Sequence, residues 1–394
     1  MNLKIKINNA TLLHLAFTFW LVSEIVFQYS MVSRLALLAF TGLAILVTLG
    51  LHWSYALTGY GLFALWSVLN IYMGYAVSVS VASKMTQTLF LNLAFLYALV
   101  CYCRYIGGVG KVLKIYQWVV FAFCVFCLIG GMGLVLSGKR LSILGINSNG
   151  IAMIAAYAAV MFFHDLLSKP KGKRRWPDVF AIGILLVTIL LTGSRKGLII
   201  PAVGLYVLIC FRKPGRFILY SLLIAAAVAA ALWLLLNVEA LYDIIGNRVE
   251  SALLYLAGEE VEEGSMNSRS QFIELAWAAS QDNLRWGHGL DCFQLLEGSR
   301  GTYSHNNYLE ILYSLGWTGV IIYYAPYVYA LLQIPRARRE DKALTAVLVA
   351  LLIPFVICDY MNVTYFTRMS LLIPTMAMLQ LKTGGRSYEI KAVL

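Results

Sequence analysis

The sequence predicts an all-α protein that crosses a membrane many times. Of its 394 residues, 60% are hydrophobic and 13% are charged, and the mean hydropathy is +0.76. Soluble globular domains do not reach this balance. Apolar runs of about 18 residues or more recur along the chain, which is the length that a transmembrane helix needs. We therefore expect about twelve transmembrane helices. The expected spans are residues 11–30, 34–50, 55–77, 86–103, 114–136, 148–167, 178–193, 197–211, 217–237, 307–332, 343–359 and 362–381.

Basic residues between the expected spans predict the orientation of the chain. Clusters of Lys and Arg fall on alternate connections, at residues 104–114, 169–175, 212–216 and 336–342. Cytoplasmic loops carry such an excess, so we expect these connections and both termini to be cytoplasmic. Lys4 and Lys6 precede the first span as in a signal peptide, but no small-residue cleavage site follows, so that span is expected to be retained. The net charge of +12 then reflects topology and contact with anionic lipid, and nucleic acid is not expected as a partner.

The chain divides into three expected parts: helices 1 to 9 over residues 1–237, an extracytoplasmic loop over residues 238–306, and three helices with a cytoplasmic tail over residues 307–394. The loop holds 11 acidic and 4 basic residues. Its acidic stretch at residues 259–264 is expected to be mobile and solvated. From Ser268 onward, apolar residues at helical spacing predict an amphipathic helix; they are Phe272, Leu275, Ala276 and Ala279.

A polar cluster stands where the loop gives way to the next apolar helix. Ser304 is expected to cap this helix, because its hydroxyl can accept a bond from a free backbone N–H. His305 follows, with a side chain whose charge can change near neutral pH. The free N–H groups and dipole at a helix start favour anions. The cluster is therefore a candidate for chemistry, although a histidine alone is more often a satisfied interfacial residue.

Three arginines are further candidates. Arg195 follows Thr192-Gly193-Ser194 in a tight turn on the outer face, and Arg269 opens the amphipathic helix. Each could be an interfacial anchor or a solvated loop residue, but together with a histidine they would suit a diphosphate, which guanidinium binds in a bidentate manner. Arg368 lies in an apolar run and is either functional or paired with Asp359.

Several motifs in order around the outer loop resemble the O-antigen ligase and O-antigen or capsule polymerase family of bacterial membrane proteins. They are Asn147-x-Asn149-Gly150, Thr192-Gly193-Ser194-Arg195, Ser268-Arg269 with Trp277, Gly287-His288-Gly289-Leu290-Asp291-x-Phe293, and Ser304-His305-Asn306-Asn307-Tyr308-Leu309-Glu310 with Gly316 and Gly319. The resemblance covers residues 140–330 well. Many relatives carry a proline before the glycine pair, where this chain has Arg285-Trp286.

The resemblance implies a fold related to the GT-C class and glycosyl transfer on the outer face of the bacterial cytoplasmic membrane. The donor would be a glycan on undecaprenyl diphosphate. His305, Arg195 and Arg269 would be catalytic, and neighbouring arginines should lower the pKa of His305 and keep it neutral. Residues expected to bind substrate are Asn147, Asn149, Ser194, Ser304, Asn306, Asn307, Tyr308, Glu310 and Arg368, although Asn147 and Asn149 could simply cap a helix.

Neither a metal nor a cofactor is expected, since no Walker loop, Rossmann glycines or zinc spacing occurs. We favour a polymerase that joins lipid-linked repeat units, with a chain-length-regulating co-polymerase as a possible partner. A ligase that transfers the glycan to lipid A core is the alternative. A transporter of an anionic or lipid-linked sugar is a third reading, which the missing internal repeat disfavours.

Overall fold

The protein is described by a computed structural model that covers residues 8–28, 30–50, 52–170, 172–212, 214–239, 242–256 and 264–383. Within these ranges the chain is helical and holds no strand, apart from one isolated bridge between Ile143 and Ile146. The all-α prediction is confirmed. Residues 259–263 of the acidic stretch at residues 259–264 and the expected cytoplasmic tail from residue 384 lie outside the described residues.

Each predicted span contains a helix. These helices are α1 (Asn9–Val26), α2 (Met31–Thr48), α3 (Tyr55–Tyr72), α4 (Val79–Tyr105), α5 (Gly110–Leu136), α6 (Ser148–Ser168), α7 (Trp176–Leu191), α8 (Arg195–Arg212), α9 (Phe217–Asn237), α13 (Asn307–Leu332), α15 (Lys342–Cys358) and α16 (Arg368–Thr383). Eight helices of the described chain are long and apolar enough to cross a membrane: α1, α2, α4, α5, α6, α9, α13 and α15. The protein is thus a polytopic membrane protein. The remaining four are shorter or more polar, so a total of twelve spans stays a prediction.

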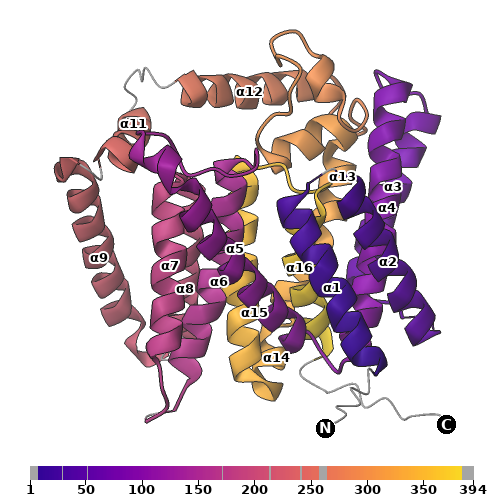
Figure 1. The fold of residues 1–394 in the computed structure, drawn as a ribbon. Helices are drawn as coiled ribbons and strands as arrows, with labels where there is room; N and C mark the ends of the chain where they lie inside the picture. Colours follow the sequence, from indigo (N-terminus) through magenta and orange to yellow (C-terminus); the bar gives the residue numbers. More distant parts are fainter. Residues whose placement is uncertain are drawn as a thin grey trace.

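The helices form one bundle with a separate layer across one end (Figure 1). Between α9 and α13, the chain forms α11 (Asn247–Leu256) and α12 (Gly264–Ser280). Helix α12 lies across the end of the bundle, roughly at right angles to the long helices, while α1 begins at the opposite end. The short helix α14 (Ile334–Glu340) lies at that opposite end as well.

Two apolar clusters hold these layers together. The large one runs through the bundle from Leu13 to Leu381. The small one lies beneath α12, where Phe272 and Ala276 pack against Phe293 and Tyr313. Leu275 and Ala279 pack around it, so the four apolar residues that predicted a helix here all lie on its buried side. This small cluster fixes the outer layer above the start of α13.

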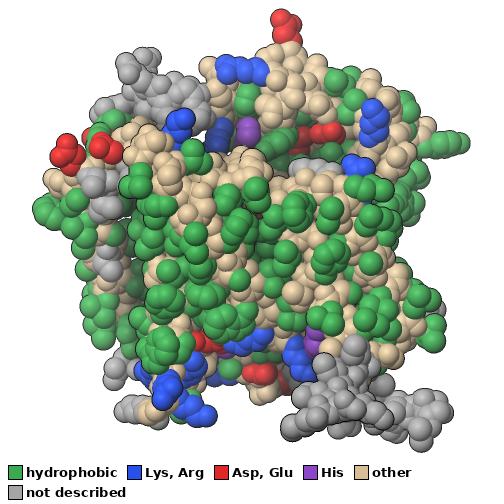
Figure 2. All heavy atoms as spheres, viewed as in Figure 1, with side chains coloured by type: hydrophobic (Ala, Val, Ile, Leu, Met, Phe, Trp, Pro, Cys, Tyr) green, Lys and Arg blue, Asp and Glu red, His purple; other side chains and the backbone are tan. Residues whose placement is uncertain are grey.

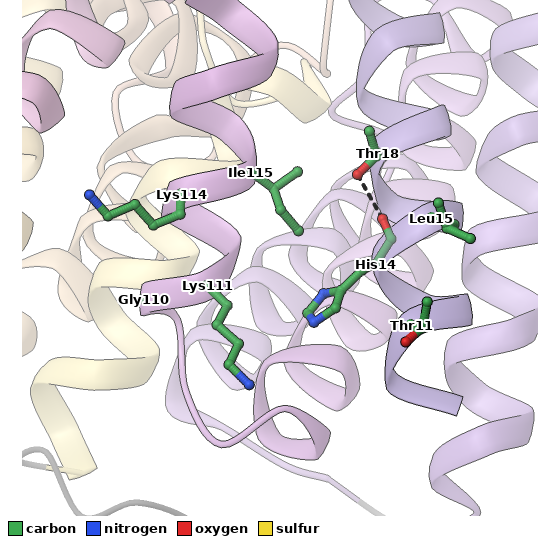
Figure 3. A pocket seen from close by; sticks show the side chains of 8 residues that line it. All are labelled: Thr11, His14, Leu15, Thr18, Gly110, Lys111, Lys114 and Ile115. Atoms are coloured by element: carbon green, nitrogen blue, oxygen red, sulfur yellow. Dashed lines mark hydrogen bonds between the residues drawn. The ribbon is translucent and has the colours of Figure 1, made fainter. Parts of the chain in front are cut away.

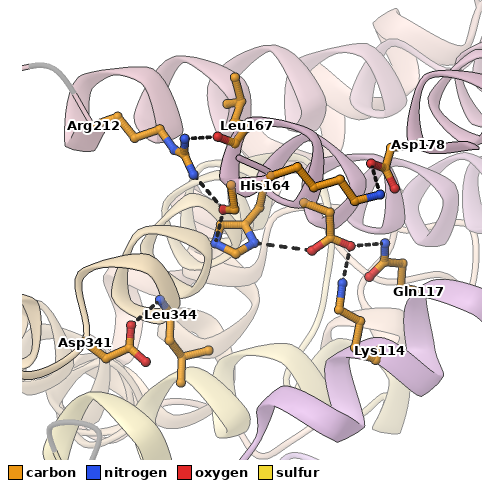
Figure 4. Close-up of polar contacts among 11 residues, drawn as sticks. Lys114, Gln117, His164, Leu167, Asp178, Arg212, Asp341 and Leu344 are labelled. Carbon is orange, nitrogen blue, oxygen red and sulfur yellow. Dashed lines mark hydrogen bonds and ion pairs between the residues drawn. The ribbon is translucent and has the colours of Figure 1, made fainter. Parts of the chain in front are cut away.

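The surface has the character of a membrane protein. Hydrophobic side chains form a broad belt around the bundle, and Lys and Arg gather above and below it (Figure 2). At the end opposite α12, Lys114 and Gln117 both donate to Asp165, and Arg212 donates to the Leu167 carbonyl (Figure 4). Partly neutralised basic groups at this level are expected where helices leave a bilayer.

Two glycines let the outer layer interlock with α13. Gly316 has φ +66° and interrupts the helix, and Gly287 has φ +77°. A Cβ on Gly316 would stand 2.4 Å from the Arg285 backbone. A Cβ on Gly287 would stand 2.4 Å from the α13 backbone at Leu315. Because the helix is broken here, the Tyr313 and Ser314 carbonyls accept bonds from the loop N–H groups of His288 (2.9 Å) and Gly289 (2.8 Å). The loop is thereby fixed relative to the polar cluster one turn earlier in α13.

Candidate functional site

His305 lies between the outer layer and the bundle. Its ring stacks on Phe272 of α12, with ring centroids 5.9 Å apart, and contacts Tyr303 at 4.5 Å. The backbone at His305 is left-handed, with φ +60°, a conformation that non-glycine residues seldom adopt. Within the described chain no hydrogen bond to the imidazole occurs. Its nitrogens therefore remain available to a ligand.

Burial and positive charge set the protonation of His305. Burial is the larger cause, followed by the charges of Arg269 and Lys196, and together they lower its pKa to about 4. The predicted direction is confirmed, with a difference in cause: desolvation comes first, and the nearby cations are Arg269 and Lys196. At neutral pH the imidazole is therefore uncharged and can accept a proton.

Ser304 is not the helix cap that the sequence predicted. Helix α13 begins two residues later than predicted, and its cap is Asn306, whose Oδ1 accepts the Leu309 N–H at 3.1 Å. Ser304 is fully buried and belongs to the preceding loop. Its N–H donates to Glu310 Oε2 at 2.7 Å, and its hydroxyl donates to the Asn306 carbonyl at 3.0 Å. Glu310, also buried, therefore reaches back from the first turn of α13 and holds Ser304, the residue before His305.

The turn before α8 brings a second set of polar groups to the same end of the bundle. Gly193 takes φ +59°, which allows α7 and α8 to meet in a tight turn. Ser194 is 2% exposed, and its hydroxyl has no hydrogen-bond partner within the described ranges. Arg195 is half-buried at the first position of α8. A buried hydroxyl beside an arginine at a helix start is suited to an anion.

Lys196 is the site residue that sequence reasoning missed. It is 5% exposed, and its ammonium donates to the Met361 carbonyl and to Asn362 Oδ1 at 3.0 Å. Its charge acts on His305, as does that of Arg269 from α12. Segments far apart in the sequence thus bring one histidine and at least two cations together. Figure 2 shows Lys or Arg side chains and a histidine in a hollow between the α12 layer and the bundle.

Asn147 and Asn149 occupy the start of α6. Asn147 caps the helix, since its Oδ1 accepts the Asn149 N–H at 2.9 Å. The Asn149 Oδ1 accepts from Arg140 at 3.1 Å, and Arg140 also donates to the Thr192 carbonyl at 2.6 Å. Arg140, which the sequence analysis did not single out, thereby ties this segment to the turn that carries Ser194. The capping interpretation of Asn147 is confirmed.

Asn307 and Tyr308 point into the protein. The Asn307 amide donates to Tyr324 (2.8 Å) and Asp359 (3.2 Å), and its Oδ1 accepts the N–H groups of Thr364 (2.9 Å) and Tyr365 (3.3 Å). The Tyr308 hydroxyl donates to the Val356 carbonyl at 2.6 Å. With these bonds made, both side chains support the site from within the bundle. For either polar group to bind substrate, its present hydrogen bonds would have to break.

Arg368 pairs with a different acid from the one considered in the sequence analysis. Its Nη1 lies 3.5 Å from Glu24 Oε1 in α1, and Glu24 also accepts from Ser33. Asp359 is instead occupied by Thr364 (2.7 Å), Tyr324 and Asn307. The proposed pair of Arg368 with Asp359 is therefore wrong. This partner could not be found by sequence spacing, because α1 and α16 stand at opposite ends of the chain.

The Arg285-Trp286 pair, which departs from the proline of many relatives, is anchored by its surroundings. The Trp286 carbonyl accepts from Asn70 at 2.6 Å, and its ring stacks on Tyr75 with centroids 5.6 Å apart. The Arg285 guanidinium lies 4.5 Å from the centre of the same ring. Aromatic stacking thus holds this part of the loop.

The fold and this site define the class of protein to which the chain belongs. It is a polytopic α-helical membrane protein with a polar site beneath an outer layer. Residues 180–324 match the family described as O-antigen ligase. This part of the chain therefore resembles the O-antigen ligase family, and the predicted resemblance to the O-antigen ligase and polymerase family is confirmed. This match indicates an O-antigen-ligase-type function for this part of the chain. No individual curated protein matches the chain.

The matched range holds most of the residues described above, including Arg195, Lys196, Arg269 and His305. Asn147, Asn149 and Arg368 lie outside it. Within the described chain, no group of three or more His, Cys, Asp or Glu side chains is arranged to hold a metal ion.

Proposed function

We propose that this protein is a polymerase that joins oligosaccharide repeat units carried on undecaprenyl diphosphate, on the outer face of the bacterial cytoplasmic membrane. The observation that supports the proposal best is the neutral, half-buried His305 beside the cations Arg269 and Lys196, within the residues that match the O-antigen ligase family. A site of this kind offers a proton acceptor and anion ligands together.

The proposed reaction forms one bond and breaks one. A sugar hydroxyl of the acceptor attacks the anomeric carbon of the donor glycan, and the bond from that carbon to the diphosphate oxygen breaks. His305 takes the hydroxyl proton, and undecaprenyl diphosphate leaves with the bonding electron pair. A base in the correct position contributes about 10²- to 10⁴-fold to such a step.

Arg195 and Arg269 stabilise the charge that develops on the leaving diphosphate, a role that a divalent cation would otherwise have. When the diphosphate is bound, its negative charge offsets the cations around His305. The pKa of His305 then rises from about 4 toward the working pH, where a general base is most effective. Substrate binding thereby prepares the base.

The ligase alternative is favoured by the description of the matched family, O-antigen ligase. In that case the same site would transfer a finished glycan to lipid A core or another acceptor. The two activities share donor chemistry and differ only in the acceptor.

One reconstitution experiment tests both. Purified protein is incubated with a defined undecaprenyl-diphosphate repeat unit in EDTA, with and without a core-lipid acceptor, and the products are separated on a gel. A ladder from donor alone supports the metal-independent polymerase. Product that forms only with the core lipid supports the ligase. No product with either acceptor, from folded protein and its cognate glycan, contradicts both.

A further inference from the structure

A cavity of about 670 Å³ lies between α1 and α5 at the end of the bundle opposite α12. It is far from the candidate site in the fold, since His305 lies beneath α12. Its lining combines basic, hydroxyl and apolar side chains: Thr11, His14, Leu15, Thr18, Gly110, Lys111, Lys114 and Ile115 (Figure 3). Its volume falls in the range of natural ligand pockets.

The cationic groups of the cavity are not equivalent. Lys114 is neutralised by Asp165, with which it forms an ion pair. Lys111 is exposed and makes no hydrogen bond or ion pair with any described residue. Figure 3 shows Lys111 approaching the cavity from α5 and His14 from α1. Among the described residues, therefore, no acid compensates the positive charge of Lys111 at the mouth of this cavity.

Two further groups can donate to an anion here. His14 Nδ1 lies 2.5 Å from the Tyr102 hydroxyl. If that hydroxyl donates, the proton of the imidazole sits on Nε2 and can be given to a ligand. Helix α5 also begins at this rim, at Gly110, without a side-chain cap on its first N–H groups. Free N–H groups at a helix start add to the attraction for negative charge.

The walls of the cavity combine exposed apolar side chains with a lysine, as a binding site for a lipid would. Leu15 is 58% exposed on α1, and Trp118, which lies outside the lining one turn beyond Lys114 on α5, is 50% exposed. Both helices are apolar enough to cross a membrane, so we expect these side chains to face acyl chains and Lys111 to stand at the polar boundary. Basic pockets between transmembrane helices at this level bind the head groups of anionic lipids.

We propose that this cavity binds an anionic phospholipid, with its phosphate at Lys111 and His14 and an acyl chain along Leu15 and Ile115. The occupant differs from a free phosphate ion because the walls are apolar and face the bilayer. The site is separate from the proposed glycosyl transfer and does not depend on it.

Native mass spectrometry of the full chain tests the proposal. The protein is purified in mild detergent and mixed with phosphatidylglycerol or with phosphatidylcholine of the same acyl chains. We expect the wild type to retain phosphatidylglycerol and to release phosphatidylcholine. Lys111→Gln should weaken retention of phosphatidylglycerol about fivefold, the effect of one lysine near a lipid surface, and Lys111→Arg should preserve it.

The matched control is Lys139→Gln, which removes an exposed lysine just beyond the other end of α5; it should leave retention unchanged. Equal retention of the two lipids by the wild type would overturn the proposal, as would unchanged retention in Lys111→Gln. Displacement of phosphatidylglycerol by inorganic phosphate at equal concentration would also overturn it, because a small anion would then be the occupant.

Discussion

His305 holds a left-handed backbone conformation, φ +60°, at the centre of the candidate site. Such a conformation costs about 1 kcal/mol or more in a non-glycine residue and persists only where the neighbours enforce it. Here they do: Ser304 is bound by Glu310, and Asn306 is fixed as the cap of α13. The ring of His305 is thereby directed to one place between α12 and the bundle.

The charge of Arg269 should be visible in the pH dependence of the proposed glycosyl transfer. Arg269→Gln removes a positive charge next to His305, so the pKa of His305 should rise from about 4 toward its ordinary value. The imidazole must be neutral to accept a proton, so the acid limb of kcat/KM should move to higher pH in the variant. The pH profile of transfer, normalised to its maximum, measures this shift.

Arg285→Gln is the control, because it removes a positive charge from the same loop at a position that does not act on His305. An acid limb in Arg269→Gln that coincides with that of the wild type would show that Arg269 does not set the protonation of His305.

At this scale the sequence offered one histidine and two arginines as candidates, which stays a prediction, and it gave no reason to add Lys196. The burial of Lys196 depends on the Met361 carbonyl and on Asn362, which are more than 160 residues away along the chain. The signal that was present, a second basic residue directly after Arg195, is also what a solvated turn would show. Only the packing of α8 against the segment after α15 distinguishes the two.

The broken helix α13 is the element on which the site is built. Its first part carries the residues that follow His305, and its break at Gly316 exposes the carbonyls that bind the loop at His288 and Gly289. The sequence predicted the helix and its approximate start. It did not predict the break, because a single glycine in an apolar run also occurs in unbroken helices. It also predicted Ser304 as the cap, whereas the structure uses Asn306.

Gly316→Ala should separate the loop from α13. The new Cβ would stand 2.4 Å from the Arg285 backbone at a residue with φ +66°, so either the loop or the helix must move. We expect a loss of about 1–3 kcal/mol in stability, together with reduced transfer. Thermal unfolding in detergent and the transfer rate measure the two effects.

Gly42→Ala in α2 provides the comparison, since a Cβ there meets nothing within 4 Å and alanine favours helix. It should leave stability equal or slightly higher. If Gly316→Ala behaved like Gly42→Ala, the interlock of loop and helix would not be what fixes the site.

The whole molecule separates two polar ends by an apolar belt. Composition and hydropathy were enough to predict this plan, because bilayer thickness dictates the length of a spanning helix. Composition and hydropathy could not predict the contacts between distant helices. The pairing of Arg368 with Glu24 in place of Asp359 is an example. Which end faces outward follows from the basic residues and is a prediction of topology.

Cysteine labelling tests that topology. Ser137→Cys lies between α5 and α6 at the α12 end, and Lys173→Cys lies between α6 and α7 at the other end; both positions are exposed. With Cys210 replaced by serine, a membrane-impermeant maleimide should label Ser137→Cys in intact cells and Lys173→Cys only after permeabilisation. The reverse pattern would place the candidate site on the cytoplasmic side and contradict the proposed reaction.

The central claim is that His305 acts on the acceptor hydroxyl while nearby cations hold the diphosphate. Its most direct test is the rate of glycan transfer by His305→Ala, measured together with the affinity for the undecaprenyl-diphosphate-linked donor. Arg195→Lys, which keeps the charge but loses the bidentate contact, is measured beside it. We predict that His305→Ala lowers transfer about 10²- to 10⁴-fold with donor affinity retained, and that Arg195→Lys weakens donor binding. Transfer at the full wild-type rate by His305→Ala would contradict the account.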